Sequence, residues 1–331
     1  MDTNSIISQI GNTPLVKLKQ PSELTGCHIY GKAEYFNPGE SVKDRAALFI
    51  VQDALKRKLI SEGGTIVEGT AGNTGIGLAI VCKEYDLKLK IVIPKTQSIE
   101  KKETLKKLGA ELIEVEAVPY ANPKNYIKIS KQIAEDLNKT NSNGVYWANQ
   151  FDNIVNSEAH IKSTAEEIWS QTAGTVDGFT CSVGTGGTLA GVSIGLKNKK
   201  KGIKIALSDP MGSALYSYFK NDKLESTGSS ITEGIGNGRV TKNFDKALID
   251  DAFQTDDVEA LNLVYDLIEK QKIILGGSSG INIAGAIKLA KKMGPGKTIV
   301  TILCDHGKRY ASKIFNKEFL KSKDLPIPKW L

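Results

Sequence analysis

Lys43 stands where the sequence could deliver a nucleophile to the start of a helix. It follows a turn expected at Asn37-Pro38-Gly39, and Ser41 with Asp44 three residues later has the spacing of a capping box. The helix is therefore expected to begin at Val42, with Lys43 in its first turn. The positive end of a helix disfavours the ammonium ion and leaves more free amine, the form that makes Schiff bases. Lys43 is thus our candidate nucleophile, although a lysine at a helix start is more often a solvated side chain.

Two glycine-rich loops follow expected strands and open expected helices, where unpaired backbone N–H groups favour anions. The first runs from Glu68 to Gly75, and the second from Gly184 to Thr188. The second loop lacks the lysine of a P-loop, so hydrolysis of nucleoside triphosphates is not expected. Its glycines, with Asp209 about 20 residues on, also imitate a dinucleotide-binding fingerprint. That alternative leaves Lys43 and its helix start unexplained.

The elements that must carry these loops alternate between apolar strands and amphipathic helices. After strands at 65–67, 90–94 and 112–115 we expect helices at about 73–85, 99–108 and 122–138. The pattern recurs, with strands near 178–183, 203–208 and 298–304 and helices near 187–197, 257–271 and 280–292. Strands joined through helices run parallel, so we expect two units of mostly parallel sheet with the site at the carboxyl ends of their strands.

Composition indicates an ordinary globular chain of about two domains, with 331 residues, 40% hydrophobic and 24% charged. The net charge of +7 comes mainly from lysine, and the run 197–201 has no interleaved aromatic residues, so no nucleic-acid partner is expected. No apolar run approaches a membrane span of about 20 residues, and the first residues do not resemble a signal peptide. We therefore expect no membrane partner and a cytoplasmic location. The cysteines have no metal-binding spacing, so no metal is predicted; they are Cys27, Cys82, Cys181 and Cys304.

Residues 37–45 read Asn-Pro-x-x-Ser-Val-Lys-Asp-Arg and resemble the cofactor-lysine motif of the cysteine synthase (O-acetylserine sulfhydrylase) family. Its members are fold-type II enzymes that use pyridoxal phosphate. Val42 and Asp44 favour this family over the related threonine and serine dehydratases, which usually carry Ser-Phe-Lys-x-Arg-Gly there. The resemblance covers nearly the whole chain, with motifs in the family's order from residues 10–15 to residues 305–310.

The resemblance implies an α/β fold of two domains, each with a mostly parallel twisted sheet flanked by helices, as in the tryptophan synthase β subunit. It assigns residues 1–14 and 37–153 to a smaller, mobile N-terminal domain that carries Lys43 and the substrate loop. It assigns residues 15–36 and 154–331 to a larger domain that holds the cofactor phosphate. The crossing of residues 15–36 into the larger domain follows from the resemblance alone.

The resemblance makes Lys43 the Schiff-base partner of pyridoxal 5'-phosphate. Asn73 matches the residue that hydrogen-bonds the phenolic oxygen of the cofactor. Ser278 matches the residue at its pyridine nitrogen, although either Ser278 or Ser279 could instead cap a helix. A neutral hydroxyl there suits elimination of a β-leaving group over transamination. The phosphate is expected on the second glycine-rich loop, at Gly184, Thr185, Gly186, Gly187 and Thr188.

The first glycine-rich loop is implied to hold the α-carboxylate of the substrate, with a contribution from Gln150. Most members of the family have serine where this chain has Ala71. The loop 233–239 is implied to lie over the substrate, whereas His160 is expected to be structural. The substrate residues implied by the resemblance are Thr70, Ala71, Gly72, Thr74, Gln150, Gly234 and Ile235.

The implied activity is β-replacement on O-acetyl-L-serine, in which sulfide displaces acetate to give L-cysteine. Lys43 would act as Schiff-base partner and then as general base. Cystathionine β-synthase or cysteine desulfhydrase activity on the same scaffold, and a non-catalytic partner-binding role, are the alternatives. The implied partners are these small molecules and a second copy of the chain in a homodimer; the C-terminal tail of serine acetyltransferase is a further partner that the family offers.

Overall fold

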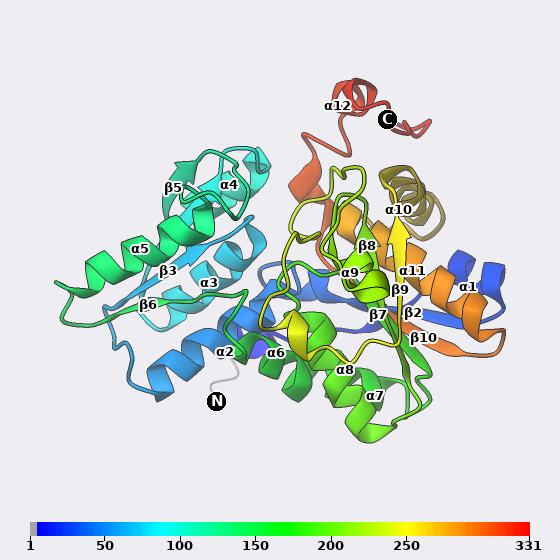
Figure 1. The fold of residues 1–331 in the computed structure, drawn as a ribbon, viewed down its shortest axis with the longest axis horizontal. Helices are drawn as coiled ribbons and strands as arrows, with labels where there is room; N and C mark the ends of the chain where they lie inside the picture. The colour runs from blue at the N-terminus through cyan, green and yellow to red at the C-terminus, as the bar shows by residue number, and fades with distance from the viewer. Residues whose placement is uncertain (1–4) are drawn as a thin grey trace.

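The computed structural model describes residues 5–331 and arranges them around two separate sheets. Figure 1 shows the sheets in different halves of the molecule, and the early strand β2 (His28–Ala33) lies in the same half as the late strand β10 (Thr298–Leu303). The predicted α/β class is confirmed, with mostly parallel sheets flanked by helices.

The smaller sheet has the order β5-β4-β3-β6, and all neighbouring strands run parallel. The inner strand β3 is buried along its whole length, as expected for a parallel sheet covered by helices. Helix α5 packs on β3 and β6, and α3 packs against α2 and β4. The elements of this half are β3 (Thr65–Gly69), β4 (Lys88–Pro94), β5 (Glu111–Val115), β6 (Val145–Trp147), α2 (Lys43–Lys56), α3 (Asn73–Glu84), α4 (Ile99–Lys107) and α5 (Tyr126–Asn138).

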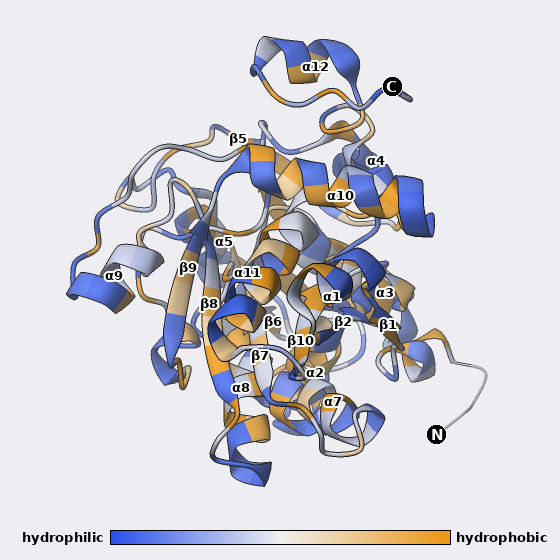
Figure 2. Ribbon diagram, turned by 90° about the vertical axis from the view of Figure 1, so that its right-hand side faces the viewer, coloured by the Kyte–Doolittle hydropathy of each residue, from blue (hydrophilic) through white to orange (hydrophobic). Residues whose placement is uncertain are grey.

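The larger sheet has the order β1-β2-β10-β7-β8-β9, in which only the β1–β2 pair is antiparallel. Helix α11 packs along β7, β8 and β10, and Figure 2 shows β8 mostly in the hydrophobic colour. The remaining strands are β1 (Leu15–Lys17), β7 (Gly178–Cys181), β8 (Lys204–Pro210) and β9 (Asp251–Thr255). The helices of this half are α1 (Lys19–Thr25), α6 (Val155–Ala159), α7 (Ala165–Gln171), α8 (Gly187–Lys199), α9 (Leu215–Asn221), α10 (Asp257–Gln271), α11 (Gly277–Met293) and α12 (Lys317–Ser322).

The chain enters the larger sheet early and then leaves it for the smaller half. Strand β2 pairs with β10 along its whole length, from His28 opposite Thr298 to Ala33 opposite Leu303. Gly31 has to be glycine at this contact, because a Cβ there would lie 2.5 Å from the Leu303 side chain. Beyond β2 the chain turns through a short 3-10 helix, Glu34–Phe36, into α2. The start of α2 is therefore placed beside the carboxyl end of β10.

The capping box predicted at the start of α2 is wrong, and the helix begins one residue later, at Lys43. Val42 donates its N–H to the Cys304 carbonyl at 2.9 Å, and Ser41 forms an antiparallel bridge with Asp305. This pairing holds Ser41 and Val42 outside the helix. Asp44 turns back to accept the Gly39 N–H instead of that of Ser41. Tertiary pairing has overridden a local capping preference.

The other predicted helices begin and end close to the expected residues, with two differences at their starts, whereas α1, α6, α7, α9 and α12 were not predicted. Helix α5 begins at Tyr126 instead of 122, because the Asn125 side chain accepts the Ile127 N–H at 3.0 Å and caps it there. Helix α11 begins at Gly277, three residues before the predicted start, with Gly276 as its N-cap. Neither Ser278 nor Ser279 therefore caps the helix.

Within residues 5–331, no helix has both the length and the apolar character that a membrane span requires. No cluster of His, Cys, Asp and Glu side chains in the same residues is arranged to hold a metal ion.

Candidate active site

A cavity of about 750 Å³ opens between the two halves, bordered by the segments that follow β3, β6, β7 and β10. The structure brings most of the predicted site residues together around this cavity. Gly186 and Thr188 line a smaller recess that also touches Lys43. The predicted residues that line the main cavity are Lys43, Thr70, Ala71, Asn73, Thr74, Gln150, Gly184, Thr185, Gly234, Ile235 and Ser278.

Gly72 and Gly187 were also predicted as site residues. Each allows its glycine-rich loop to pack closely against a supporting side chain. Gly72 has φ +127°, and a Cβ there would lie 2.7 Å from the Lys101 side chain. A Cβ on Gly187 would lie 2.1 Å from the Asn156 amide. Only glycine lets the two loops pack this closely against their supports.

Lys43 is held by contacts on both sides of its backbone. Its N–H donates to the Ser41 hydroxyl at 3.3 Å, and the preceding pairing of Val42 with Cys304 ties this turn to the end of β10. The Asn37 amide fixes the turn before it, donating to the Ser41 carbonyl at 3.1 Å and accepting the Gly11 N–H at 2.8 Å. The position of the Lys43 backbone therefore depends on both halves of the molecule.

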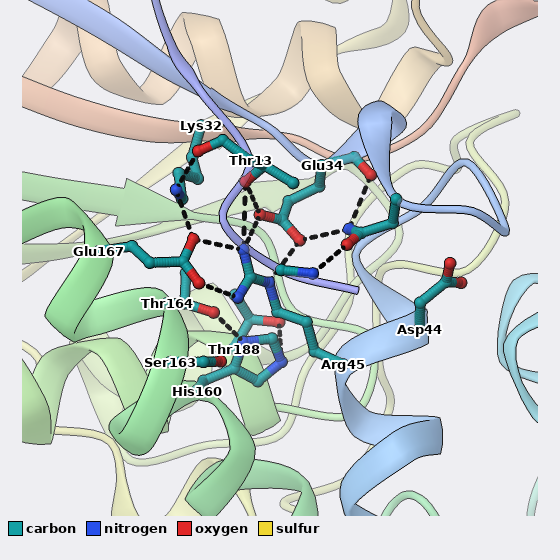
Figure 3. A network of polar contacts seen from close by, with 12 residues as sticks. Thr13, Lys32, Glu34, Asp44, Arg45, His160, Ser163, Thr164, Glu167 and Thr188 are labelled. Carbon is teal, nitrogen blue, oxygen red and sulfur yellow. Dashed lines mark hydrogen bonds and ion pairs between the residues drawn. The ribbon is translucent and has the colours of Figure 1, made fainter. Parts of the chain in front are cut away.

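Arg45, two residues further along α2, anchors the helix in a buried ionic cluster (Figure 3). Its guanidinium bridges the Glu34 carboxylate at 2.8 Å and the Glu167 carboxylate at 2.6 Å. Lys32 adds a second cation, 2.6 Å from Glu167, so two cations face two anions. Burial alone would raise the pKa of Glu34, but Arg45 holds it at about 2. Asp44 points away from this cluster in Figure 3.

Asn73, at the first position of α3, is held by two charged groups. Its amide nitrogen donates to Asp305 at 2.7 Å, and its amide oxygen accepts from Arg309 at 2.6 Å. The Tyr310 hydroxyl also donates to Asp305, at 2.6 Å, and Arg309 reaches the Gly39 carbonyl. The side chain therefore has a fixed orientation, and one of its two N–H groups remains able to donate into the cavity.

Gln150 and Thr74 meet across the first glycine-rich loop. The Thr74 hydroxyl donates to the Gln150 amide oxygen at 2.6 Å, and the Gln150 nitrogen donates to the Gly69 carbonyl at 3.3 Å. Beneath them lies Glu68, which is 1% exposed. Burial raises the pKa of Glu68 to about 8, against hydrogen bonds from Gln150 that lower it. A neutral Glu68 leaves the loop free of a negative charge that would repel a carboxylate.

The second glycine-rich loop is held by a ring of side-chain amides and hydroxyls. Asn156 donates to the Thr185 hydroxyl at 3.0 Å, and Thr241 donates to the Thr185 carbonyl at 2.7 Å. The imidazole of His160 lies between Thr188, at 3.2 Å, and Thr164, at 2.8 Å. Burial lowers the pKa of His160 to about 3, so the ring is neutral and orients the Thr188 hydroxyl.

This loop fits the phosphate of the expected cofactor. Gly186 has φ +89°, and a Cβ there would lie 2.5 Å from the Phe244 backbone, so the main chain itself forms the floor of the recess. The start of α8 and two threonine hydroxyls face the same space, which is the donor set that a phosphate requires. Asp209, the acid of the dinucleotide alternative, is buried and accepts the Tyr216 N–H at 2.8 Å.

The two candidate serines of α11, Ser278 and Ser279, make different contacts. Ser278 lines the cavity with Lys43 and Cys304, whereas the Ser279 hydroxyl accepts the Cys304 N–H at 2.9 Å. Burial raises the pKa of the Cys304 thiol to about 11, so this cysteine is a neutral neighbour of Ser278.

Loop 232–239 covers one side of the cavity and is tied down at its start. Glu233 pairs with Lys101 of α4 at 2.6 Å and also with Lys313, which follows the 3-10 helix Gly307–Tyr310. Lys101 is 1% exposed, and burial lowers its pKa despite the Glu233 charge. The ammonium also lies 4.4 Å from the centre of the Tyr310 ring. These contacts join α4 of the smaller half to the loop of the larger half.

Apart from Arg239, the last residue of the predicted loop 233–239, the outer rim of the cavity was not predicted from the sequence. Arg239 lies there with Tyr120, Phe151 and Asp152, close to the predicted Gln150. One signal was present, because the chain has only four arginines and Arg239 is one of three that fall inside motifs. Lys101 had no such signal, since it reads as one more lysine on an amphipathic helix.

Comparisons with known proteins identify the family of this chain. The family model described as "Pyridoxal-phosphate dependent enzyme" matches residues 6–305. Cysteine synthase 1 of Neurospora crassa is 50% identical over 96% of this chain and 84% of its own length. The structure of an O-acetylserine dependent cystathionine beta-synthase from Helicobacter pylori superposes with TM-score 0.85 at 32% identity, over 95% of this chain and 98% of the other.

A hydrogen sulfide-producing enzyme from Fusobacterium nucleatum superposes with TM-score 0.83 at 36% identity, over 93% of this chain and 99% of the other. The match to the family model extends over most of the chain, and it includes Lys43 and both glycine-rich loops. The chain therefore belongs to the pyridoxal-phosphate dependent enzyme family and, within it, to the cysteine synthases.

Proposed function

We propose that this protein makes L-cysteine from O-acetyl-L-serine and sulfide, releasing acetate. The observation that carries the proposal is the position of Lys43, which lines both the main cavity beside the carboxylate loop and the recess formed by the phosphate loop. The relatives named cysteine synthase support the choice of substrates, since the first of them is 50% identical to this chain.

The residues present define how pyridoxal phosphate would be held. Thr185, Gly186 and Thr188 would bind its phosphate, Asn73 its phenolic oxygen and Ser278 its ring nitrogen. Gly184 and Gly187 would shape the backbone of the phosphate loop. When bound, this cofactor supplies an electron sink for bonds to the α-carbon of an amino acid.

Lys43 would serve twice, first as the group that carries the cofactor and then as the base. Its Nζ would take the proton from the α-carbon of O-acetylserine. Acetate would leave from the β-carbon with the bonding electron pair, hydrosulfide would supply the pair for the new C–S bond, and Lys43 would return a proton to the α-carbon. Ser278 is uncharged and would leave the ring nitrogen without a counter-anion, which favours rapid loss of the leaving group over long storage of charge.

The first loop would orient the amino acid. Thr70, Gly72 and Thr74 would surround the α-carboxylate with hydroxyl and backbone donors, and Gln150 would add the amide N–H that Gly69 does not use. Ala71, Gly234 and Ile235 would form the walls around the side chain of the substrate. Neutral Glu68 beneath the loop would keep the carboxylate site free of repulsion.

The test is product analysis on protein loaded with pyridoxal phosphate, with O-acetylserine and sulfide as substrates. We expect equal amounts of cysteine and acetate from the wild type and neither from Lys43→Ala, which should also lose the visible absorbance of the covalently bound cofactor. Lys56→Ala, an exposed lysine at the other end of the same helix, is the matched control and should retain both signals. Absence of cysteine from the wild type would overturn the assignment.

Ala71 favours a second activity, formation of cystathionine with homocysteine as the nucleophile. A serine hydroxyl is missing from the cavity wall, which leaves it slightly wider and less polar. We expect sulfide to remain the better nucleophile, with measurable cystathionine as a side product. A competition assay should show Ala71→Ser shifting the ratio toward sulfide by up to about tenfold, the value of one hydrogen bond. If homocysteine reacts faster than sulfide in the wild type, cystathionine synthesis becomes the main activity. Desulfhydration would be detected as sulfide release from the protein incubated with cysteine alone.

We further propose that the protein is cytoplasmic and forms a homodimer. Light scattering tests the dimer. The C-terminal tail of serine acetyltransferase is a candidate ligand of the cavity.

The domain division proposed for the chain is 1–14 with 37–153, and 15–36 with 154–331. Support for it comes from β1 and β2, which pair into the larger sheet. Residues 1–4 of the first unit lie outside the described residues.

A further inference from the structure

Arg239 lines the cavity together with Tyr120, which is 42% exposed, so the pair lies where the cavity opens to solvent. Its guanidinium donates to both carboxylate oxygens of Asp152, at 3.1 and 3.0 Å. The central carbon of the guanidinium lies 4.3 Å from the centre of the Tyr120 ring and 5.6 Å from that of Phe151. All of Arg239, Tyr120 and Phe151 line the cavity. A planar cation held by two rings and a two-point ion pair has little freedom to swing aside.

The partners of Arg239 are themselves fixed or come from different parts of the fold. Asp152 also accepts the Lys242 N–H at 3.0 Å, and its pKa is lowered by these contacts although burial acts in the other direction. Phe151 follows directly on Gln150, whereas Tyr120 lies between β5 and α5. Arg239 itself is the last residue of loop 232–239, which covers one side of the cavity and is called the cover loop below. The contact therefore joins the smaller half to the cover loop across the rim.

The charge of Arg239 is already balanced by Asp152. This argues for a steric role of Arg239 and against a role in binding the substrate carboxylate. Asp152 offers one full negative charge at hydrogen-bond distance, and the side chains of both partners are only 19% exposed. An arginine that served to capture the carboxylate of an incoming amino acid would have to compete with this carboxylate. The stacked guanidinium is therefore better suited to limit the width of the cavity than to bind the carboxylate of a substrate.

We propose that Arg239, stacked with Tyr120, is a specificity-determining residue that narrows the mouth of the cavity and selects sulfide over amino-acid thiols. This inference rests on the proposed β-replacement, because it concerns the second substrate of that reaction. Sulfide has a single heavy atom and needs little room. Homocysteine must bring its amino-acid end through the rim, where the stack of Arg239 and Tyr120 stands. Removal of either side chain widens the mouth for the larger nucleophile and leaves sulfide nearly unaffected.

The first experiment compares second-order rate constants for homocysteine and for sulfide in the wild type, Arg239→Ala and Tyr120→Ala. We expect the homocysteine to sulfide ratio to rise about tenfold in both variants, the scale on which steric walls discriminate substrates. Tyr120→Phe keeps the ring and should keep the ratio. Arg57→Ala removes an exposed arginine paired with Asp53 on α2 and is the control for loss of one positive charge.

A second readout does not require turnover. Calorimetry on the loaded protein compares the binding of cysteine and cystathionine, the products of the two nucleophiles. Cystathionine should gain about tenfold in affinity relative to cysteine when Arg239 or Tyr120 is truncated. An unchanged ratio in both experiments would overturn the proposal, and a fall would identify Arg239 as a carboxylate receptor instead. Tyr120 is 42% exposed, so Tyr120→Ala decides the question if Arg239→Ala fails to fold.

The two experiments separate this inference from the function on which it rests. A wild type that makes no cysteine from sulfide would overturn the proposed function. A wild type that makes cysteine while the variants keep its selectivity would overturn only the role of Arg239.

Discussion

Ser278 and Ser279 illustrate how neighbouring residues of the same type take different tasks. From the sequence, each could have capped the helix or faced the cofactor. Only the position of each serine along α11 decides between these roles. Ser278 lines the cavity, while Ser279 is committed to the Cys304 backbone. Sequence could place a hydroxyl at the right loop, but it could not say which way each side chain would point, since that depends on the contact with the end of β10.

A charge at position 278 should slow the proposed reaction. Ser278→Asp would hold a proton on the ring nitrogen of the cofactor and stabilise charge that the reaction has to release. We expect kcat for cysteine formation to fall at least about tenfold below that of Ser278→Ala, which has no charge. The loaded variants must show equal cofactor absorbance. Equal kcat values for the two variants would mean that Ser278 does not face the ring nitrogen.

Glu68 should make the stability of the protein depend on pH. Its pKa is raised to about 8 in the folded state by burial, so between about pH 4.5 and 8 the folded protein binds more protons than the unfolded chain. The free energy of unfolding therefore falls as pH rises through this window. Asp44, whose pKa burial raises to about 7, contributes with the same sign.

Glu68→Gln removes this titration while keeping the shape of the side chain. Between pH 5 and 8 the variant should lose on the order of 3 kcal/mol less unfolding free energy than the wild type. Urea unfolding at several pH values measures how the free energy of unfolding changes with pH. This slope is unaffected if the glutamine changes stability by the same amount at every pH. Parallel slopes for the two proteins would show that Glu68 titrates normally.

At the scale of elements, hydrophobic periodicity was a good guide wherever a helix covers a sheet. The bounds of α3, α4, α8 and α10 lie within about two residues of those predicted. It failed where the start of an element is decided by distant residues, as for α2, whose first turn is set by β10. Strands β1, β2, β6 and β9 were not predicted, because their short or mixed patterns become strands only through their neighbours.

Helix α2 should depend on the ionic cluster around Arg45 more than on its own sequence. Arg45→Lys keeps one positive charge but cannot bridge Glu34 and Glu167 together, so a buried carboxylate loses its partner. We expect a loss of about 3–5 kcal/mol of unfolding free energy, measured in urea. Arg57→Lys, at an exposed pair on the same helix, should change it by no more than about 0.5 kcal/mol. A similar small effect for both would mean that the cluster adds no stability.

At the scale of the whole molecule, the site exists because the chain crosses between its halves. Residues 28–33 pair with 298–303, about 270 positions away in the sequence, and only then does α2 begin. No local pattern encodes such a pairing, so the crossing came from the family resemblance. The same limit applies to the pair of Lys101 and Glu233, which joins segments whose sequences give no sign of each other.

The triad of Lys101, Glu233 and Lys313 should hold the cover loop over the cavity. Glu233→Gln leaves Lys101 buried without its counter-ion, which is expected to cost about 3 kcal/mol or more and to release the loop. Hydrogen exchange of the backbone amides of 232–239 should therefore become faster, and KM for O-acetylserine should rise more than kcat falls, since the loop shields bound substrate. Glu318→Gln removes an exposed pair with Lys321 on α12 and serves as the control. Unchanged exchange in the loop, with KM as in the wild type, would leave the triad as a local packing feature and place the closure of the cavity at the Arg239 end of the loop.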